Sequence, residues 1–108
     1  MKRIFAVLAA LAVIAAREWE ECETCRLSVI GTKLFIDIDE KSSVQEISDA
    51  TCHRLRRIGA KKSAHLCEEI IQKILGNEEL MKKIKDNREA GWEKRFCAKE
   101  LQKKYCKR

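Results

Sequence analysis

Six cysteines are the residues of this chain with the most distinctive chemistry. Cys22 and Cys25 form a pair, and because residues three apart share one face of a helix, their thiols would point the same way. The other four lie far along the chain, at Cys52, Cys67, Cys97 and Cys106. Thiols arranged in this way can take part in redox exchange, bind zinc, or form structural disulfides.

Two of these chemistries fit the spacing poorly. A thioredoxin-like redox pair needs a βαβ setting, and the sequence has no such pattern. A zinc site needs a second matched pair or a Cys/His cluster at ligand spacing, whereas eight residues separate Cys97 from Cys106. Structural disulfides are therefore the preferred interpretation, and six cysteines leave fifteen connectivities open.

The beginning of the chain has the pattern of a secretory signal. Two basic residues follow the initial Met, residues 4–16 are uninterruptedly apolar, and small residues precede Arg17. The apolar run is shorter than the roughly 20 residues that span a bilayer. We expect removal of residues 1–16 and a single helical domain over residues 17–108. That domain would be secreted or held in a secretory granule or lysosome-like compartment.

The charge of the chain is unevenly distributed. Residues 17–50 hold four basic and nine acidic side chains, whereas residues 51–108 hold seventeen basic and eight acidic ones. A basic half of this size suggests an anionic partner, either a phospholipid surface or nucleic acid. Nucleic acid is the less favoured of the two, because the basic residues come without a recognisable binding motif.

Hydrophobic spacing predicts helices along the whole chain after the signal. We expect helices over residues 19–36, 44–58 and 64–75, then one after Asn77 and a last one from Trp92. A capping box at residues 43–46 begins the second helix, and Ser63 and Asn77 are the expected N-caps of the next two. The fold class is therefore all-α, a bundle of four to five amphipathic helices.

The cysteine spacing and the helices around it resemble the saposin-like family (saposin B-type domain). Members of that family are secreted helical domains whose cysteines run as a C-x2-C pair, a middle pair and a late pair. Here Cys22-x2-Cys25 and the 26 residues between Cys25 and Cys52 match that pattern. The resemblance covers residues 19–106, and the basic character is closest to the cationic NK-lysin- and granulysin-like members.

The resemblance implies a nested set of three disulfides, Cys22–Cys106, Cys25–Cys97 and Cys52–Cys67. In one unbroken helix, Cys97 and Cys106 would face about 180° apart, because each residue turns a helix by about 100°. They could not both meet the first pair. We therefore expect the last helix to stop after about Leu101, or the pairing to differ.

The resemblance also implies binding to lipid, most directly the permeabilisation of anionic, microbial membranes by a basic surface and opening helices. The expected membrane-binding residues are Arg54, Arg56, Arg57, Lys61, Lys62, Lys82, Lys83, Lys85 and Arg88. Ile70, Ile71 and Ile74 are the expected lipid-facing apolar residues, with ordinary core packing as their alternative. Related members transfer lipids or activate lipid hydrolases instead. Self-association into a homo-oligomer is a further expectation.

An enzyme is not expected. The chain has no Gly-rich phosphate loop and no G-x-S-x-G motif, and paired cysteines leave no set of residues for a nucleophile. We therefore assign no catalytic residue, no cofactor and no metal. The main rival to lipid binding is a secreted, disulfide-stapled interaction protein, such as a toxin, effector or ligand, that binds a protein partner.

Overall fold

A computed structural model describes residues 18–107, and these residues form helices without any strand. The helices are α2 (Glu21–Ile38), α3 (Val44–Thr51), α4 (His53–Arg57), α5 (Lys61–Leu75), α6 (Glu78–Asp86) and α7 (Trp92–Lys99). The predicted all-α class is confirmed. The predicted signal over residues 1–16 lies outside the described residues.

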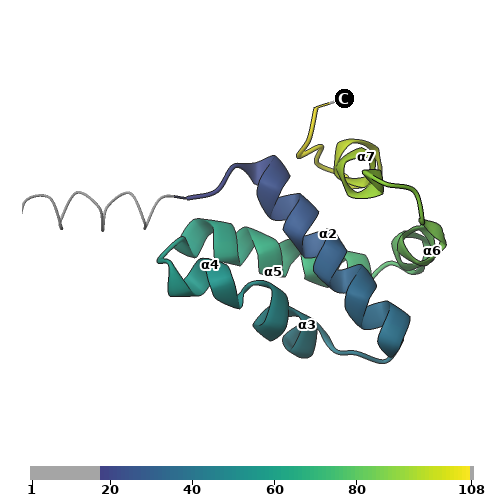
Figure 1. Cartoon of the computed structure of the whole chain (residues 1–108), viewed down its shortest axis with the longest axis horizontal. Helices are drawn as coiled ribbons and strands as arrows, with labels where there is room; N and C mark the ends of the chain where they lie inside the picture. Colours follow the sequence, from purple (N-terminus) through teal and green to yellow (C-terminus); the bar gives the residue numbers. More distant parts are fainter. Residues whose placement is uncertain (1–17, 108) are drawn as a thin grey trace, which may run out of the picture.

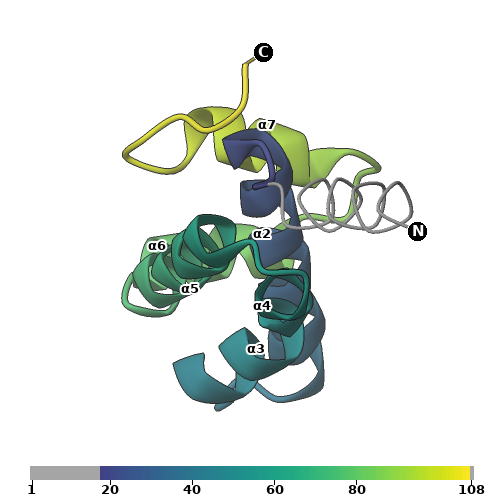
Figure 2. The same ribbon diagram turned by 90° about the vertical axis from the view of Figure 1, so that its left-hand side faces the viewer.

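The arrangement is built on two long helices that cross. Helix α2 runs diagonally over α5 (Figure 1). Helices α3 and α4 lie on the lower left side of α2 in this view, and α6 and α7 lie on its right. Turned by 90°, the molecule has α7 and the C-terminal tail at the top, and α3 and α4 lie beside the lower half of α2 (Figure 2). Helix α2 contacts α3, α5, α6 and α7, and is therefore the common neighbour of most of the bundle.

Two of the predicted helix starts are confirmed. The Ser43 hydroxyl accepts a hydrogen bond from the Glu46 amide at 3.1 Å, which caps α3. The Asn77 side chain accepts from the amides of Glu79 at 3.0 Å and Leu80 at 3.2 Å, which caps α6. Each cap satisfies backbone donors that the first helical turn leaves free.

The predicted helix over residues 44–58 is wrong in one respect, because it is divided at Cys52 into α3 and α4. The break changes the direction of the chain, and the two helices have different neighbours. Helix α3 packs against both α2 and α5, whereas α4 packs against α5 and α3 but not α2. The described residues consequently form six helices where four to five were expected.

The predicted start of the third helix is also wrong. Helix α5 begins at Lys61, so Ser63 lies inside its first turn and is not the N-cap. The cap comes from a distant segment: the Glu18 carboxylate accepts from the amides of Lys62 at 3.2 Å and Ser63 at 2.8 Å. The Ser63 hydroxyl accepts from the Trp19 amide at 2.8 Å. We call residues 18–20 the N-terminal strap.

The apolar interior forms two clusters. The first joins α2, α5, α6, α7 and the tail, and includes Val29, Ile70, Ile74, Ile84 and Phe96. The second joins α3, α4 and the first part of α5, and includes Ile47, Leu55, Ala64 and Ile71. Helix α5 contributes to both, so it is the element that connects the two halves of the core.

A row of small polar side chains runs along the buried side of α2. Thr24, Ser28 and Thr32 are fully buried, at four-residue intervals. Each hydroxyl donates to the carbonyl four residues earlier, at 3.0, 2.7 and 2.7 Å. The row therefore satisfies its own polar groups and adds little apolar surface to either cluster. We call it the polar row.

Beside the polar row, α2 and α3 approach closely at Gly31. A Cβ built on Gly31 would lie 2.9 Å from the Cβ of Thr51 and still nearer to that residue's Oγ1 and Cγ2. Such distances are shorter than real Cβ contacts, so only glycine fits at the present spacing of the two helices.

Gly31→Ala is expected to destabilise the protein by about 1–3 kcal/mol, because overpacking at a close contact forces the helices apart. Chemical denaturation of the oxidised protein would measure the change. Gly76→Ala is the matched control, since its Cβ would meet only backbone oxygens at 3.3 Å and beyond. Equal loss in the two variants would show that the contact with Thr51 is not what restricts position 31.

The Glu18 strap predicts a pH dependence. Hydrogen bonds from the α5 amides, that of Ser63 first, hold the pKa of Glu18 below its ordinary value. A lowered folded-state pKa stabilises the fold above the unfolded pKa of about 4.3, and the contribution is lost as pH falls through the folded value. Glu18→Gln should therefore lower the melting temperature at pH 7, and the difference from wild type should shrink towards pH 3.

Glu20→Gln is the control for this pH series, because Glu20 is an exposed carboxylate of the same segment. A melting-temperature difference for Glu18→Gln that stays constant from pH 7 to pH 3, or one that Glu20→Gln reproduces, would contradict the capping role.

Candidate functional site: a disulfide frame and a cationic face

Three disulfides join the described helices. Cys22 pairs with Cys106, Cys25 with Cys97 and Cys52 with Cys67. This is the nested pairing that the resemblance implied. The first two bonds close loops of 84 and 72 residues between α2 and the C-terminal segment, and the third closes a loop of 15 between α4 and α5. Long loops restrict the unfolded chain most, by about 4–5 kcal/mol for the first bond.

The end of α7 explains how two cysteines nine positions apart reach the same helix. Helix α7 stops at Lys99, and the tail folds back so that the amides of Tyr105 and Cys106 both donate to the Cys97 carbonyl, at 3.0 and 3.3 Å. The early stop expected from helical facing is confirmed, two residues sooner than Leu101. Because of the fold-back, Cys106 lies beside Cys97 and both reach α2.

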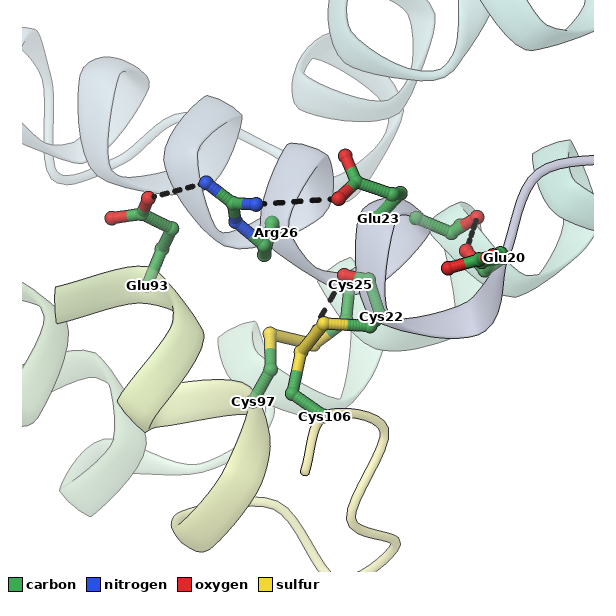
Figure 3. The surroundings of a disulfide bond; sticks show 9 residues. Glu20, Cys22, Glu23, Cys25, Arg26, Glu93, Cys97 and Cys106 are labelled. Carbon is green, nitrogen blue, oxygen red and sulfur yellow. Dashed lines mark hydrogen bonds and ion pairs between the residues drawn. A yellow bond between two sulfur atoms is a disulfide. The ribbon is translucent and has the colours of Figure 1, made fainter. Parts of the chain in front are cut away.

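An arginine stands next to this double disulfide. Arg26 donates to Glu23 within α2 and to Glu93 of α7, both at 3.2 Å (Figure 3). The Glu93 side chain is only 12% exposed, so its pairing is less screened by solvent than that of a surface carboxylate. The Arg26 pair thus reinforces the covalent contact between α2 and α7 and engages an acidic group of α7.

The first group of expected membrane-binding residues lies on α4 and at the start of α5. Arg56 is engaged within the fold, because its guanidinium pairs with Asp49 and Glu68. Lys62 lies near Glu18, whose pKa its charge helps to lower. Arg54, Arg57 and Lys61 are exposed and have no ion pair among the described residues. We call these three residues with Lys62 the α4–α5 face.

A depression opens in this face, lined by Ala50, His53, Arg54, Arg57 and Ile58. Ile58 is 36% exposed and stands next to the two arginines. The depression therefore combines uncompensated positive charge with an accessible apolar side chain. Ile58 was not among the residues predicted from the sequence, because nothing in its spacing distinguishes it from a core position.

The second group of basic residues is separate from the first. It lies on α6 and the turn after it, and α4 and α6 do not pack against each other. Lys83 pairs with Glu100 at 2.5 Å, a hydrogen bond that raises the pKa of Lys83, and Lys85 pairs with Glu40 at 2.7 Å. Lys82 and Arg88 are exposed. The structure thus leaves the α4–α5 face as the more concentrated group.

The three expected lipid-facing isoleucines are buried in this structure. Ile70, Ile71 and Ile74 have no exposed surface. Ile70 and Ile74 belong to the first apolar cluster and Ile71 to the second. They would meet lipid only after the helices that cover them have moved.

Apart from Ile58, the large apolar residues that are exposed in the described part of the chain lie on α2. Ile30, Leu34 and Ile38 recur every four residues and are 38%, 60% and 88% exposed. Ile30 and Leu34 recur at helical spacing beside the buried Val29 and Ile36, so the structure buries only part of the apolar side of α2. The pairs Lys33–Asp37 and Lys85–Glu40 lie near this α2 stripe, so it has no excess of positive charge.

Two further features are absent from residues 18–107. In that range no three His, Cys, Asp or Glu side chains come close enough to hold a metal ion. None of the helices there combines the length and the hydropathy needed to cross a bilayer.

Comparison with protein-family models, with curated proteins and with solved structures gave no match to this chain. The likeness to the saposin-like family therefore depends on the cysteine frame and the helices described above.

Proposed function

We propose that this protein is a secreted, saposin-like protein that binds and permeabilises anionic membranes through the α4–α5 face. It carries out no catalysis and needs no cofactor. The observation that supports this function most directly is the exposed group of Arg54, Arg57 and Lys61 around Ile58, which has no acidic partner in the described part of the chain.

The disulfide frame supports both the family and the compartment. Nested bonds that join the first helix to the last, with one bond in the hairpin between them, are what the saposin-like resemblance implies. Three disulfides are also compatible with an extracellular protein, since such bonds persist where the environment is oxidising.

The electrostatics of the face support docking on an anionic surface. Each basic residue near such a surface contributes about 1 kcal/mol of attraction, and salt weakens it. Ile58 would enter the headgroup region beside the arginines, since an exposed apolar side chain loses its contact with water there.

The divided core supports an opening step after docking. Val29 of α2 belongs to the first apolar cluster and Leu27 and Phe35 pack against the second, whereas the hydroxyls of the polar row bond within α2 and add little apolar surface. Movement of α2 away from α5 along that row would uncover Ile70 and Ile74 to lipid, and loss of the α3 and α4 packing would uncover Ile71. The disulfides of α2 to the tail would hold one half together while Cys52–Cys67 holds the other.

The α2 stripe favours a second candidate function, the binding of a protein partner. Ile30, Leu34 and Ile38 present an accessible apolar row with balanced charge, which an anionic membrane has no electrostatic reason to prefer. An apolar helix of a partner, or a second copy of this chain, could cover it as in helix-in-groove recognition.

The first prediction for this function is dye leakage caused by the oxidised protein. Leakage should occur from anionic vesicles, should be weak from neutral ones, and should fall as salt rises, because the Debye length shortens. Binding without leakage would indicate lipid transfer or activation of a hydrolase. If the protein neither caused leakage from nor co-sedimented with either kind of vesicle, the proposed membrane function would be wrong.

A second prediction separates the two candidate surfaces. Arg57→Gln/Lys61→Gln should weaken partitioning onto anionic vesicles by about 10- to 30-fold, at about 1 kcal/mol for each charge removed. Ile58→Asp should reduce it further, because it adds a repelled charge at the contact. Lys41→Gln/Lys73→Gln, which removes two exposed charges elsewhere, should have a much smaller effect.

Ile38→Asp is the control for the apolar substitution, since Ile38 is even more exposed than Ile58 but lies on the α2 stripe. If Ile38→Asp abolished vesicle binding and Ile58→Asp left it intact, the membrane contact would lie on the α2 stripe and not on the α4–α5 face. Analytical ultracentrifugation of the same variant would then show whether the stripe joins two copies of the chain.

A further inference from the structure

A third concentration of basic residues lies on α7 and the tail, away from α4 in both views (Figures 1 and 2). One depression there is lined by Lys94, Arg95, Ala98, Lys99 and Lys107, and another by Ala98, Lys99, Lys104, Cys106 and Lys107. Three lining residues are common to both, so the two depressions adjoin. We call them together the α7 groove.

The groove follows from the fold-back of the tail. Two hydrogen bonds to the Cys97 carbonyl and the Cys22–Cys106 bond fix the tail against the end of α7. This arrangement brings Lys104 and Lys107 to Lys99, which a continued helix would carry away from them. Ala98, only 6% exposed, forms a small apolar floor between the longer side chains.

The positive charge of the groove is uncompensated because the acidic residues of α7 are engaged elsewhere. Glu93 pairs with Arg26 of α2, and Glu100 pairs with Lys83 of α6. Of the five basic lining residues, Arg95 has an ion pair, with the largely exposed Glu89. Lys94, Lys99, Lys104 and Lys107 have none within residues 18–107, and no acidic side chain lines either depression.

We infer that the α7 groove binds a compact group carrying two or more phosphates. Lysine ammonium groups bind phosphate as point charges, and several of them around one depression suit a ligand with several negative charges. Depressions of about 150 and 400 Å³ admit a compact ligand. A single carboxylate would neutralise only one of the four unpaired lysines.

A nucleic-acid strand fits the groove less well. Single strands are held by bases stacked on aromatic rings along a basic channel. Among the described residues, no aromatic ring lines either depression. Trp92 and Phe96 are buried in the first apolar cluster, and Tyr105 is partly buried against it with Lys103 lying over its ring at 5.5 Å. Phosphate charge, without base stacking, is therefore the chemistry that the groove recognises.

The groove is independent of the proposed membrane function, because it shares no residue with the α4–α5 face. Its test is calorimetric titration of the oxidised full chain with inositol hexakisphosphate, a soluble probe that needs no membrane. We expect saturable binding that weakens as salt rises. Lys99→Gln/Lys107→Gln should weaken it by about tenfold or more, since two charge contacts are removed.

Two variants guard against a general effect of net charge. Lys41→Gln/Lys73→Gln removes the same charge outside the groove and should change affinity less than about twofold. Lys99→Arg/Lys107→Arg keeps the charge and should restore binding. Equal weakening by the two glutamine variants, or no saturable binding by the unaltered protein, would overturn the inference.

Vesicles distinguish the source of the phosphates. Vesicles of a neutral phospholipid with a small fraction of a multiply phosphorylated phosphoinositide are compared with vesicles brought to the same negative surface charge by phosphatidylserine. Preference for the phosphoinositide that Lys99→Gln/Lys107→Gln removes identifies a lipid headgroup, whereas binding of the soluble probe alone identifies a free phosphorylated compound. If the α4–α5 variants lost vesicle leakage but still bound inositol hexakisphosphate as the unaltered protein does, phosphate binding by the α7 groove would be supported independently of the membrane function.

Discussion

The covalent attachment of α2 to the C-terminal segment is the constraint on which the rest of the structure depends. Cys22 and Cys25 lie in the first turns of α2, and their partners hold α7 and the tail against it. With one end of α2 fixed in this way, its other contacts follow: Arg26 reaches Glu93, and Lys33 donates to the carbonyls of Ile84 at 3.1 Å and Lys85 at 3.4 Å at the end of α6. A cation at a helix C-terminus complements the partial charge there.

This attachment also determines where charge is left uncompensated. Glu93 and Glu100 lie on or next to α7 but pair with α2 and α6, so the outer side of α7 keeps its lysines and loses its acids. On α4 the same separation occurs within one turn, because Arg56 takes up Asp49 and Glu68 while its neighbours Arg54 and Arg57 remain unpaired. Surface potential in this protein therefore arises from internal ion pairing as much as from composition.

The fold could be predicted well where the signal is local. The caps at Ser43 and Asn77 lie within three residues of the amides they bind. The early end of α7 followed from the facing of two cysteines together with the nested pairing that the family resemblance implies. Predictions failed where distant segments decide. Glu18 caps α5 from 44 residues away, and the division at Cys52 reflects which neighbours α3 and α4 pack against.

The candidate site was predictable to a similar extent. The basic residues of α4 could be named from the sequence, but their ion pairs could not, since Arg56 and Lys83 differ from their neighbours only in what lies opposite them. The lysines of the α7 groove come together only through the fold-back of the tail. Ile30 and Leu34 share the helical spacing of buried residues, and only the absence of a covering helix among the described residues makes them exposed.

The Cys22–Cys106 bond has a mechanical consequence. A force applied at residues 18 and 107 would pass from one segment of the chain to the other through that bond, because Cys22 and Cys106 lie only a few residues from the two points of attachment. The helices between the two cysteines would carry almost none of the load. The contacts outside the covalent loop would yield first, among them those of the N-terminal strap with the first turn of α5. Tension on the ends would thus release Glu18 from its helix and leave the six-helix arrangement intact.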